Sequence, residues 1–187
     1  ARAEPAIDAG RRIATPIAPG SLRMGWKKVA IAGGIIVSIF LAFGVRRSLA
    51  SRWHANLGAI EMARVELEGW PTGKWDDGRS VAALGPAKSC FERAVQLDPR
   101  HRTAHHRLGL IAMLRRDFET ARYHLEQAYQ IDNTHRGIRK SLAYSYVWSG
   151  NLAQATPLLA DIPEARDELD TYVWWWGMQG RDDLAGY

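Results

Sequence analysis

Residues 102–135 read RTAHHRLGLIAMLRRDFETARYHLEQAYQIDNTH and contain two amphipathic runs separated by Arg116-Asp117. Apolar residues recur at three- and four-residue intervals in both runs, which predicts one helix over 103–115 and a second over 118–131. Small residues at Gly109, Ala121 and Ala128 predict that the two helices cross closely. The stretch therefore indicates a helix-turn-helix unit.

The unit recurs along the chain with a period of 34 residues. Alanines stand 34 residues apart, and a large apolar residue follows each of them four positions later. The pairs are Ala87 with Phe91, Ala121 with Leu125, and Ala155 with Leu159. A fixed period of this length predicts an all-α solenoid of stacked helix pairs.

The order Leu108-Gly109, Ala121, Leu125 and Ala128 resembles the tetratricopeptide repeat. The resemblance implies a non-enzymatic scaffold that binds other proteins along a concave face. We expect a linker and first repeat helix over 48–69, an inserted loop over 70–80, and a solenoid over 81–187. Within the solenoid, one helix is expected from Val81 to Leu97. In the unit from Arg136 to about Ala165, Pro157 and Pro163 predict a short second helix.

Residues 29–45, VAIAGGIIVSIFLAFGV, carry no charge and are flanked by basic residues. This predicts a single transmembrane helix over 23–47, with a cleaved signal peptide as the alternative. No proline lies between 45 and 69, so the span could continue into the first repeat helix. Small residues lie on one face of the span at intervals of four: Ala30, Gly34, Ser38 and Ala42. This face predicts contact with another transmembrane helix. The alternative is that small residues are simply common in membrane spans.

Charge is unevenly distributed along the chain. Residues 1–52 hold nine Lys/Arg against two acids, whereas residues 53–187 hold sixteen against eighteen. The folded part is slightly acidic, which argues against a nucleic-acid partner and favours a lipid bilayer beside the basic flanks. Residues 1–22 are expected to form a disordered or extended arm. Five basic residues lie in the twenty positions before the span and four in the twenty after it, which favours an extracytoplasmic C-terminal domain. We expect a single-pass protein of the bacterial plasma membrane.

The resemblance also implies which first-helix positions line the concave face. These partner-binding candidates are Met62, His106, Leu110, Met113, Lys140, Tyr144 and Val147. The set is mostly apolar, which suits an amphipathic helix or an extended apolar segment. The alternative is internal packing of these residues.

Tryptophans supply a second candidate surface. Trp174, Trp175 and Trp176 are consecutive, and successive helical residues are about 100° apart, so at least one should point outward. Trp70 and Trp75 lie in the expected loop. The five are candidate exposed aromatic residues for a partner or a membrane interface.

No catalytic or cofactor motif is present in the sequence. His101 and His105 have the spacing of a metal pair but lack a Cys or Glu at a ligand position, so no metal site is expected. We expect a membrane-anchored scaffold that binds another protein, itself membrane-associated. The alternatives are an accessory subunit of an energy-converting or light-harvesting membrane complex, an assembly factor for surface or secretion machinery, or a detached regulatory domain of a glycan-processing membrane enzyme.

Overall fold

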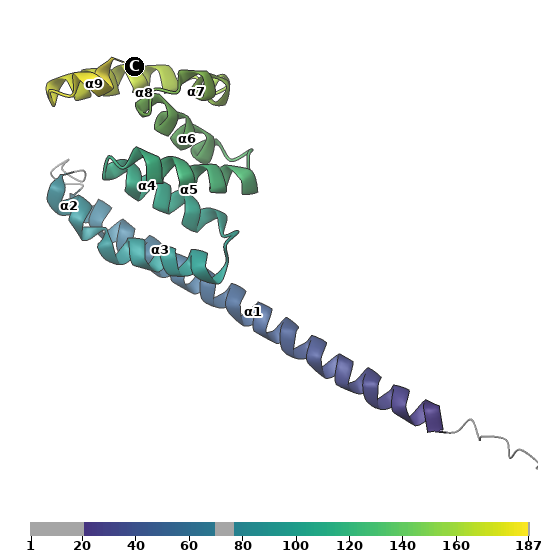
Figure 1. The fold of residues 1–187 in the computed structure, drawn as a ribbon. Helices are drawn as coiled ribbons and strands as arrows, with labels where there is room; N and C mark the ends of the chain where they lie inside the picture. Colours follow the sequence, from purple (N-terminus) through teal and green to yellow (C-terminus); the bar gives the residue numbers. More distant parts are fainter. Residues whose placement is uncertain (1–20, 70–76, 187) are drawn as a thin grey trace, which may run out of the picture. The chain divides into compact units, whose positions relative to one another are not determined.

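The computed structural model describes residues 21–69 and 77–186, and the part it describes is helical and contains no strand (Figure 1). The chain divides into two compact units, Ala1–Phe43 and Gly44–Tyr187. The predicted arm lies outside the described residues up to position 20, and residues 21 and 22 belong to the first helix. Trp70 and Trp75 also lie outside them.

Helix α1 runs from Ser21 to Gly69 without a break, as the absence of proline allows. In the N-terminal unit, its large apolar side chains between Val29 and Phe43 are all more than half exposed. Among the described residues, α1 contains the one segment that is apolar and long enough to cross a membrane. From residue 21 onward, no described part of that unit covers this apolar surface.

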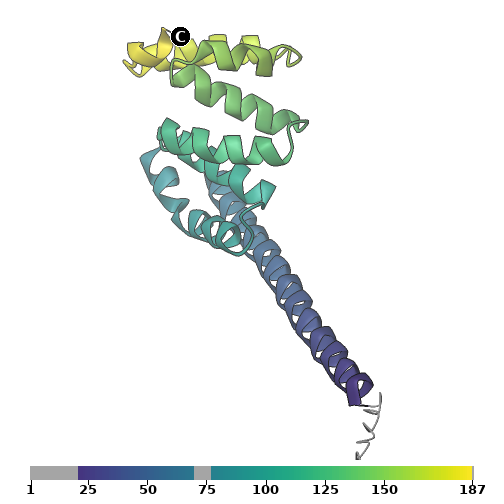
Figure 2. The same cartoon turned by 45° about the vertical axis from the view of Figure 1, so that its right-hand side comes forward.

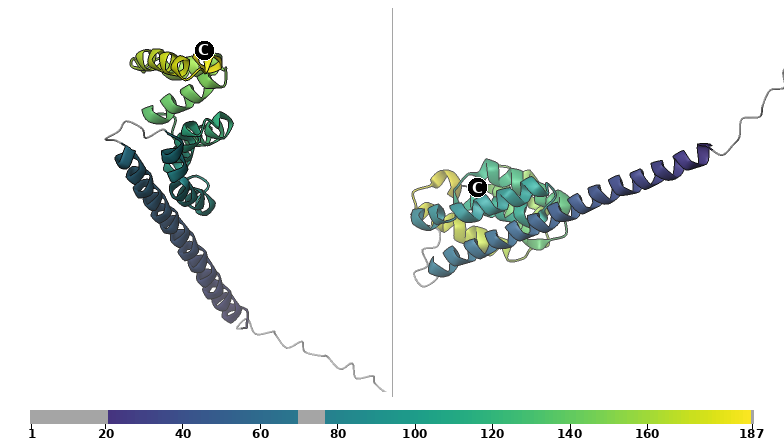
Figure 3. Two further views of the ribbon diagram at one scale, coloured as in Figure 1. Left: turned by 90° about the vertical axis from the view of Figure 1, so that its left-hand side faces the viewer. Right: turned by 90° about the horizontal axis from the view of Figure 1, so that it is seen from below.

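The C-terminal unit contains the part of α1 from residue 44 onward and, among the described residues, eight further helices (Figure 2). Helices that lead into and through the first complete repeat are α2 (Gly78–Ala83), α3 (Gly85–Leu97), α4 (Arg102–Leu114) and α5 (Phe118–Ile131). The remaining helices are α6 (Arg136–Trp148), α7 (Leu152–Leu159), α8 (Ala165–Met178) and α9 (Asp182–Ala185). Figure 3 shows the helices from α4 to α9 following one another in chain order through the unit.

The single helix expected over Val81–Leu97 is wrong, because the structure has two helices, α2 and α3, separated at Leu84. Pro86 stands in the first turn of α3 and has no N–H to donate to a carbonyl of α2, so the helix cannot continue through it. The short second helix predicted for the unit that begins at Arg136 is confirmed, since α7 has eight residues and includes Pro157.

Close approach of paired helices depends on two glycines. A Cβ placed on Gly109 would lie 2.5 Å from Cγ of Leu125, and one on Gly58 would lie 2.9 Å from Cε1 of Phe91. No side chain fits at either position without displacing its neighbour. The prediction that Gly109 allows α4 and α5 to cross closely is therefore confirmed.

Helix ends follow the repeat as well. The Nδ1 atoms of His101 and His135, 34 residues apart, accept the N–H groups of Ala104 and Ile138 at 3.2 Å and so cap α4 and α6. These histidines therefore have a capping role that their place in the sequence did not suggest.

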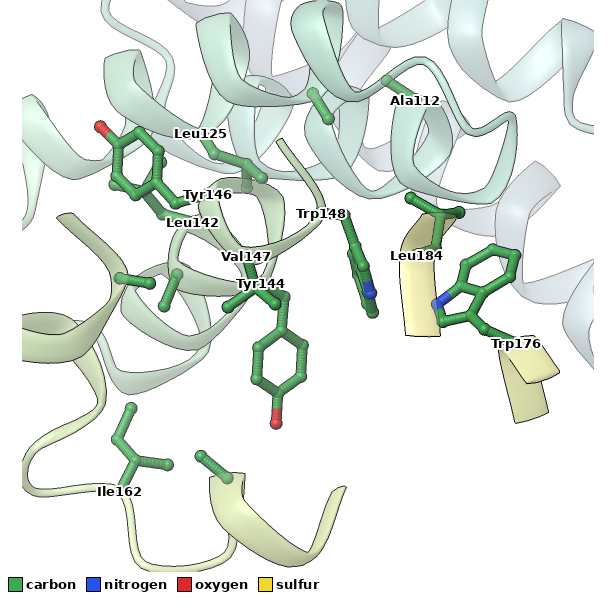
Figure 4. Close-up of a cluster of buried hydrophobic side chains, with 14 residues drawn as sticks. Ala112, Leu125, Leu142, Tyr144, Tyr146, Val147, Trp148, Ile162, Trp176 and Leu184 are labelled. Atoms are coloured by element: carbon green, nitrogen blue, oxygen red, sulfur yellow. The ribbon is translucent and has the colours of Figure 1, made fainter. Parts of the chain in front are cut away.

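Two buried clusters make up the core of the C-terminal unit. One joins α1, α3 and α4 around Phe91, and the other joins the helices from α4 to α9 around Trp148. Figure 4 shows that side chains of α6 lie in different parts of the second cluster: Tyr146 and Leu142 lie beside Leu125, whereas Trp148 lies on the side of Leu184 and Trp176.

Candidate protein-binding groove

A groove of about 580 Å³ opens within the C-terminal unit, and five helices line it. Aliphatic and thioether side chains from α1 and α4 form one side of it. These side chains are Met62, Leu110, Met113 and Leu114, and Glu66 of α1 lies beside them in the lining. A cavity of this size with mostly apolar walls is suited to a few side chains of a partner segment.

Aromatic side chains from α5, α6 and α8 form another part of the groove lining. The rings of Trp148 and Tyr172 are perpendicular with centroids 5.1 Å apart, and Tyr144 meets the same two rings edge to face. Phe118, Trp174, Trp175 and Trp176 complete this lining. Edge-to-face pairs of this kind fix each ring in place, so the aromatic side of the groove is preorganised.

A small polar network lies among these aromatic rings. The Nζ atom of Lys140 donates to Oε1 of Glu168 at 2.9 Å, and the hydroxyl of Tyr144 donates to Oε2 at 2.7 Å. Burial raises the pKa of Glu168, but these two hydrogen bonds outweigh it and the pKa stays below its usual range. Burial, with the carboxylate beside it, raises the pKa of Tyr144. Glu168 is thus held charged and Tyr144 neutral.

Arg116 connects the turn after α4 to the aromatic residues of α8. Its guanidinium lies 4.9 Å from the ring centroid of Trp176 and 5.9 Å from that of Trp175. Its backbone has φ of 59°, and the corresponding turns after α6 and α8 have glycines at this position, Gly150 and Gly180. A side chain in this left-handed conformation costs roughly 1–2 kcal/mol, which the cation–π contact helps to offset.

The structure brings together five of the seven residues expected in the groove: Met62, Leu110, Met113, Lys140 and Tyr144. Val147 and His106 are not among the residues that line it. Val147 is buried in the core cluster around Trp148. His106 lies against the start of α6, with its ring centroid 5.7 Å from that of His135.

The tryptophan expectation is correct in part. Trp174 is 64% exposed, as required of at least one member of the run, and Trp175 is half-buried. The expectation that Trp176 is exposed is wrong: it is 5% exposed, because the rotation between neighbours turns it toward Trp148 and Leu184 (Figure 4).

Several groove residues were missed in the sequence. Leu114 and Trp148 follow the predicted Leu110 and Tyr144 by four positions, so extending each stripe by one helical turn would have found them. Glu168 and Tyr172 on α8 carried no such signal, since the register of α8 is offset by the shortened α7.

The histidines do not converge on a common point. His105 Nε2 lies 3.0 Å from the carbonyl oxygen of Pro99, and its Nδ1 lies 3.1 Å from Nδ1 of His124, while His101 caps α4. Within residues 21–69 and 77–186, no group of three or more metal-liganding side chains comes together. The nitrogen atoms of His105 are engaged in hydrogen bonds instead.

A protein-family model described as "Tetratricopeptide repeat" matches residues 112–174, from the end of α4 into α8. This stretch is similar to tetratricopeptide repeats. Repeats of this family are non-catalytic and generally mediate protein–protein interaction. No curated protein matches the chain in a sequence comparison. The match and the helical architecture together support a tetratricopeptide repeat protein.

Proposed function

We propose that this protein is a membrane-anchored scaffold whose groove binds an apolar segment of another protein. The single observation that carries the proposal is the groove itself, which is lined by aliphatic and aromatic side chains, most of them within the region similar to tetratricopeptide repeats. Apolar burial would supply most of the binding free energy, at roughly 25 cal/mol for each Å² removed from water.

Polar groups in the groove would orient the bound segment. The Lys140–Glu168–Tyr144 network presents a fixed carboxylate and ammonium among apolar walls. The indole N–H of Trp176 is buried and has no hydrogen-bond partner among the described residues, so it is a donor that a carbonyl of the segment could satisfy. A few such groups in an apolar groove set the direction and register of a ligand.

The proposed anchor is the N-terminal part of α1. Its apolar side chains from Val29 to Phe43 are exposed and flanked by basic residues, which suits a bilayer with headgroups at both ends. We place this anchor in a bacterial plasma membrane with the C-terminal unit on the extracytoplasmic side. The partner is then a protein that reaches the same membrane surface.

A second candidate function is that of a fixed subunit in a membrane complex. It is favoured by the surface of α1 around Gly34 and Ser38, where the Ser38 hydroxyl donates to the Gly34 carbonyl at 2.9 Å. The hydroxyl is thereby satisfied within its own helix, and Ala30 and Ala42 continue a shallow surface that another transmembrane helix could approach.

Two matched substitutions test the groove. Thr171 lies in the groove and Thr156 lies outside it, and each hydroxyl donates to the carbonyl four residues earlier on an exposed helix. We expect Thr171→Arg to remove a co-purifying protein from the chain isolated in mild detergent, and Thr156→Arg to leave it bound. Equal recovery of that protein with both variants would refute the proposed site.

A further inference from the structure

The part of α1 in the C-terminal unit carries an apolar stripe that the described residues of that unit leave exposed. Leu49, Trp53, Ile60 and Leu67 are 60%, 65%, 51% and 71% exposed. Monomeric proteins seldom leave large apolar side chains aligned in this way, so the stripe calls for an occupant.

The stripe has the spacing of a coiled coil. Trp53, Ile60 and Leu67 are seven residues apart, and Leu49 precedes Trp53 by four. The intervening positions of the same heptad pattern, Asn56 and Ala63, are exposed as well. Residues repeating every 3.5 positions stay on one face of a helix that winds around another helix.

This face is separate from the face of α1 that already packs. Ser51 donates to the carbonyl of Ala94 at 2.8 Å, and Gly58 lies against the ring of Phe91. These contacts fix α3 on the opposite side of α1. Ser51 stands two residues after Leu49 and Gly58 stands five after Trp53, which are rotations of about 200° and about 140° around the helix. The stripe is therefore free to meet a second helix without disturbing the repeat.

We propose that the stripe pairs with the same stripe of a second copy, as a parallel two-stranded coiled coil. The parallel direction rests on the proposed membrane anchor, because copies inserted in one membrane with one topology present α1 in the same direction. In register, each stripe residue then meets its own equivalent, and the interface is self-complementary as a two-fold dimer requires.

Asn56 gives this pairing a register. A polar Asn inside an apolar seam costs stability, and this cost is smallest when it faces its equivalent in the partner helix, which favours the in-register alignment. Arg46 lies seven residues before Trp53, so like charges of the two copies end the seam on that side. The seam therefore spans residues 49–67.

Cysteine cross-linking in membranes tests the pairing with the full chain. In a Cys90→Ser background, we expect disulfide-linked dimers from Trp53→Cys, Ile60→Cys and Leu67→Cys, several-fold more than from the flanking exposed positions Ala59→Cys and Glu68→Cys. Similar yields from positions 59 and 60, or no dimer from any seam position, would overturn the proposal. A dimer from Ile60→Cys with none from Trp53→Cys or Leu67→Cys would overturn the parallel arrangement.

A mass measurement in detergent provides the second readout. The double variant Ile60→Asp/Leu67→Asp is expected to reduce the protein mass from two chains to one while retaining the helical circular dichroism of the parent chain. A mass of two chains in this variant would contradict the seam. Partner recovery with Thr171→Arg is measured separately, so loss of groove binding and loss of pairing are distinguishable.

Discussion

The hydroxyl of Tyr144 donates a hydrogen bond to the carboxylate of Glu168, with 2.7 Å between the two oxygen atoms. This bond joins α6 to α8 within the groove, and Lys140 holds the other oxygen of the same carboxylate. These two hydrogen bonds to one carboxylate fix how α6 and α8 face each other among the aromatic rings of the groove.

Removal of this hydroxyl should weaken both the fold and the groove. We expect Tyr144→Phe to lower the free energy of unfolding by about 1–2 kcal/mol, because a hydrogen bond to a charged group is lost while Lys140 still pairs with Glu168. Tyr146→Phe is the control, since the Tyr146 hydroxyl donates to Glu126 at 2.9 Å away from the groove. Denaturant unfolding should show losses in both variants, and only Tyr144→Phe should reduce partner recovery.

Two substitutions at Arg116 separate the free-energy cost of its left-handed backbone conformation from the stabilisation by its cation–π contact with Trp176. Arg116→Ala keeps the left-handed conformation and loses the cation–π contact with Trp176, so the free energy of unfolding should fall by about 0.5–1 kcal/mol. Arg116→Gly removes the conformational cost as well and should be about 1 kcal/mol more stable than Arg116→Ala. Equal stability of the two variants by denaturant titration would show that this turn carries no strain.

Two half-buried histidines should make the fold sensitive to mild acid. Burial lowers the pKa of His106 and of His124 to about 4. Both rings therefore bind a proton more readily when unfolded, with a pKa near 6.5, and their contribution to stability is complete above that pH.

The free energy of unfolding should then fall as the pH decreases from about 6.5 toward 4. The total loss should be on the order of 1–2 kcal/mol, since partial exposure of both rings to solvent limits the effect. Denaturant midpoints at pH 7 and pH 5 measure this loss. His106→Gln should make the midpoint less dependent on pH in this range. An unchanged dependence in that variant would remove His106 from the explanation.

Membrane anchorage gives a separate prediction. Two arginines in the apolar part of α1, Val37→Arg with Phe40→Arg, should release the protein from membranes under alkaline carbonate extraction, since each arginine costs about 2.5–3.5 kcal/mol in a span. The parent chain should stay in the membrane fraction. A parent chain extracted as readily as the variant would exclude a transmembrane anchor.

The spacing of small and apolar residues within one repeat predicted the pairing of α4 with α5, because the residues in that spacing, Gly109 and Leu125 among them, are the ones that pack between the two helices. The same pattern predicted Leu110 and Tyr144 in the groove, since both lie on the inner stripe of a first helix. It could not place Trp176 or Glu168, because the orientation of α8 depends on where the shortened α7 ends. The break at Leu84 was missed because the apolar spacing continues through Pro86, which acts on the backbone instead.

Site-specific photo-crosslinking tests the groove most directly. Glu66 and Thr171 line it from α1 and α8, are exposed, and belong to no part of the core, while Thr156 lies outside it. A benzophenone side chain at position 66 or 171 of the full chain in its native membrane should yield an adduct with the same protein, and position 156 should yield none. Adducts of the same protein from all three positions, or from position 156 alone, would contradict a groove that binds a partner segment.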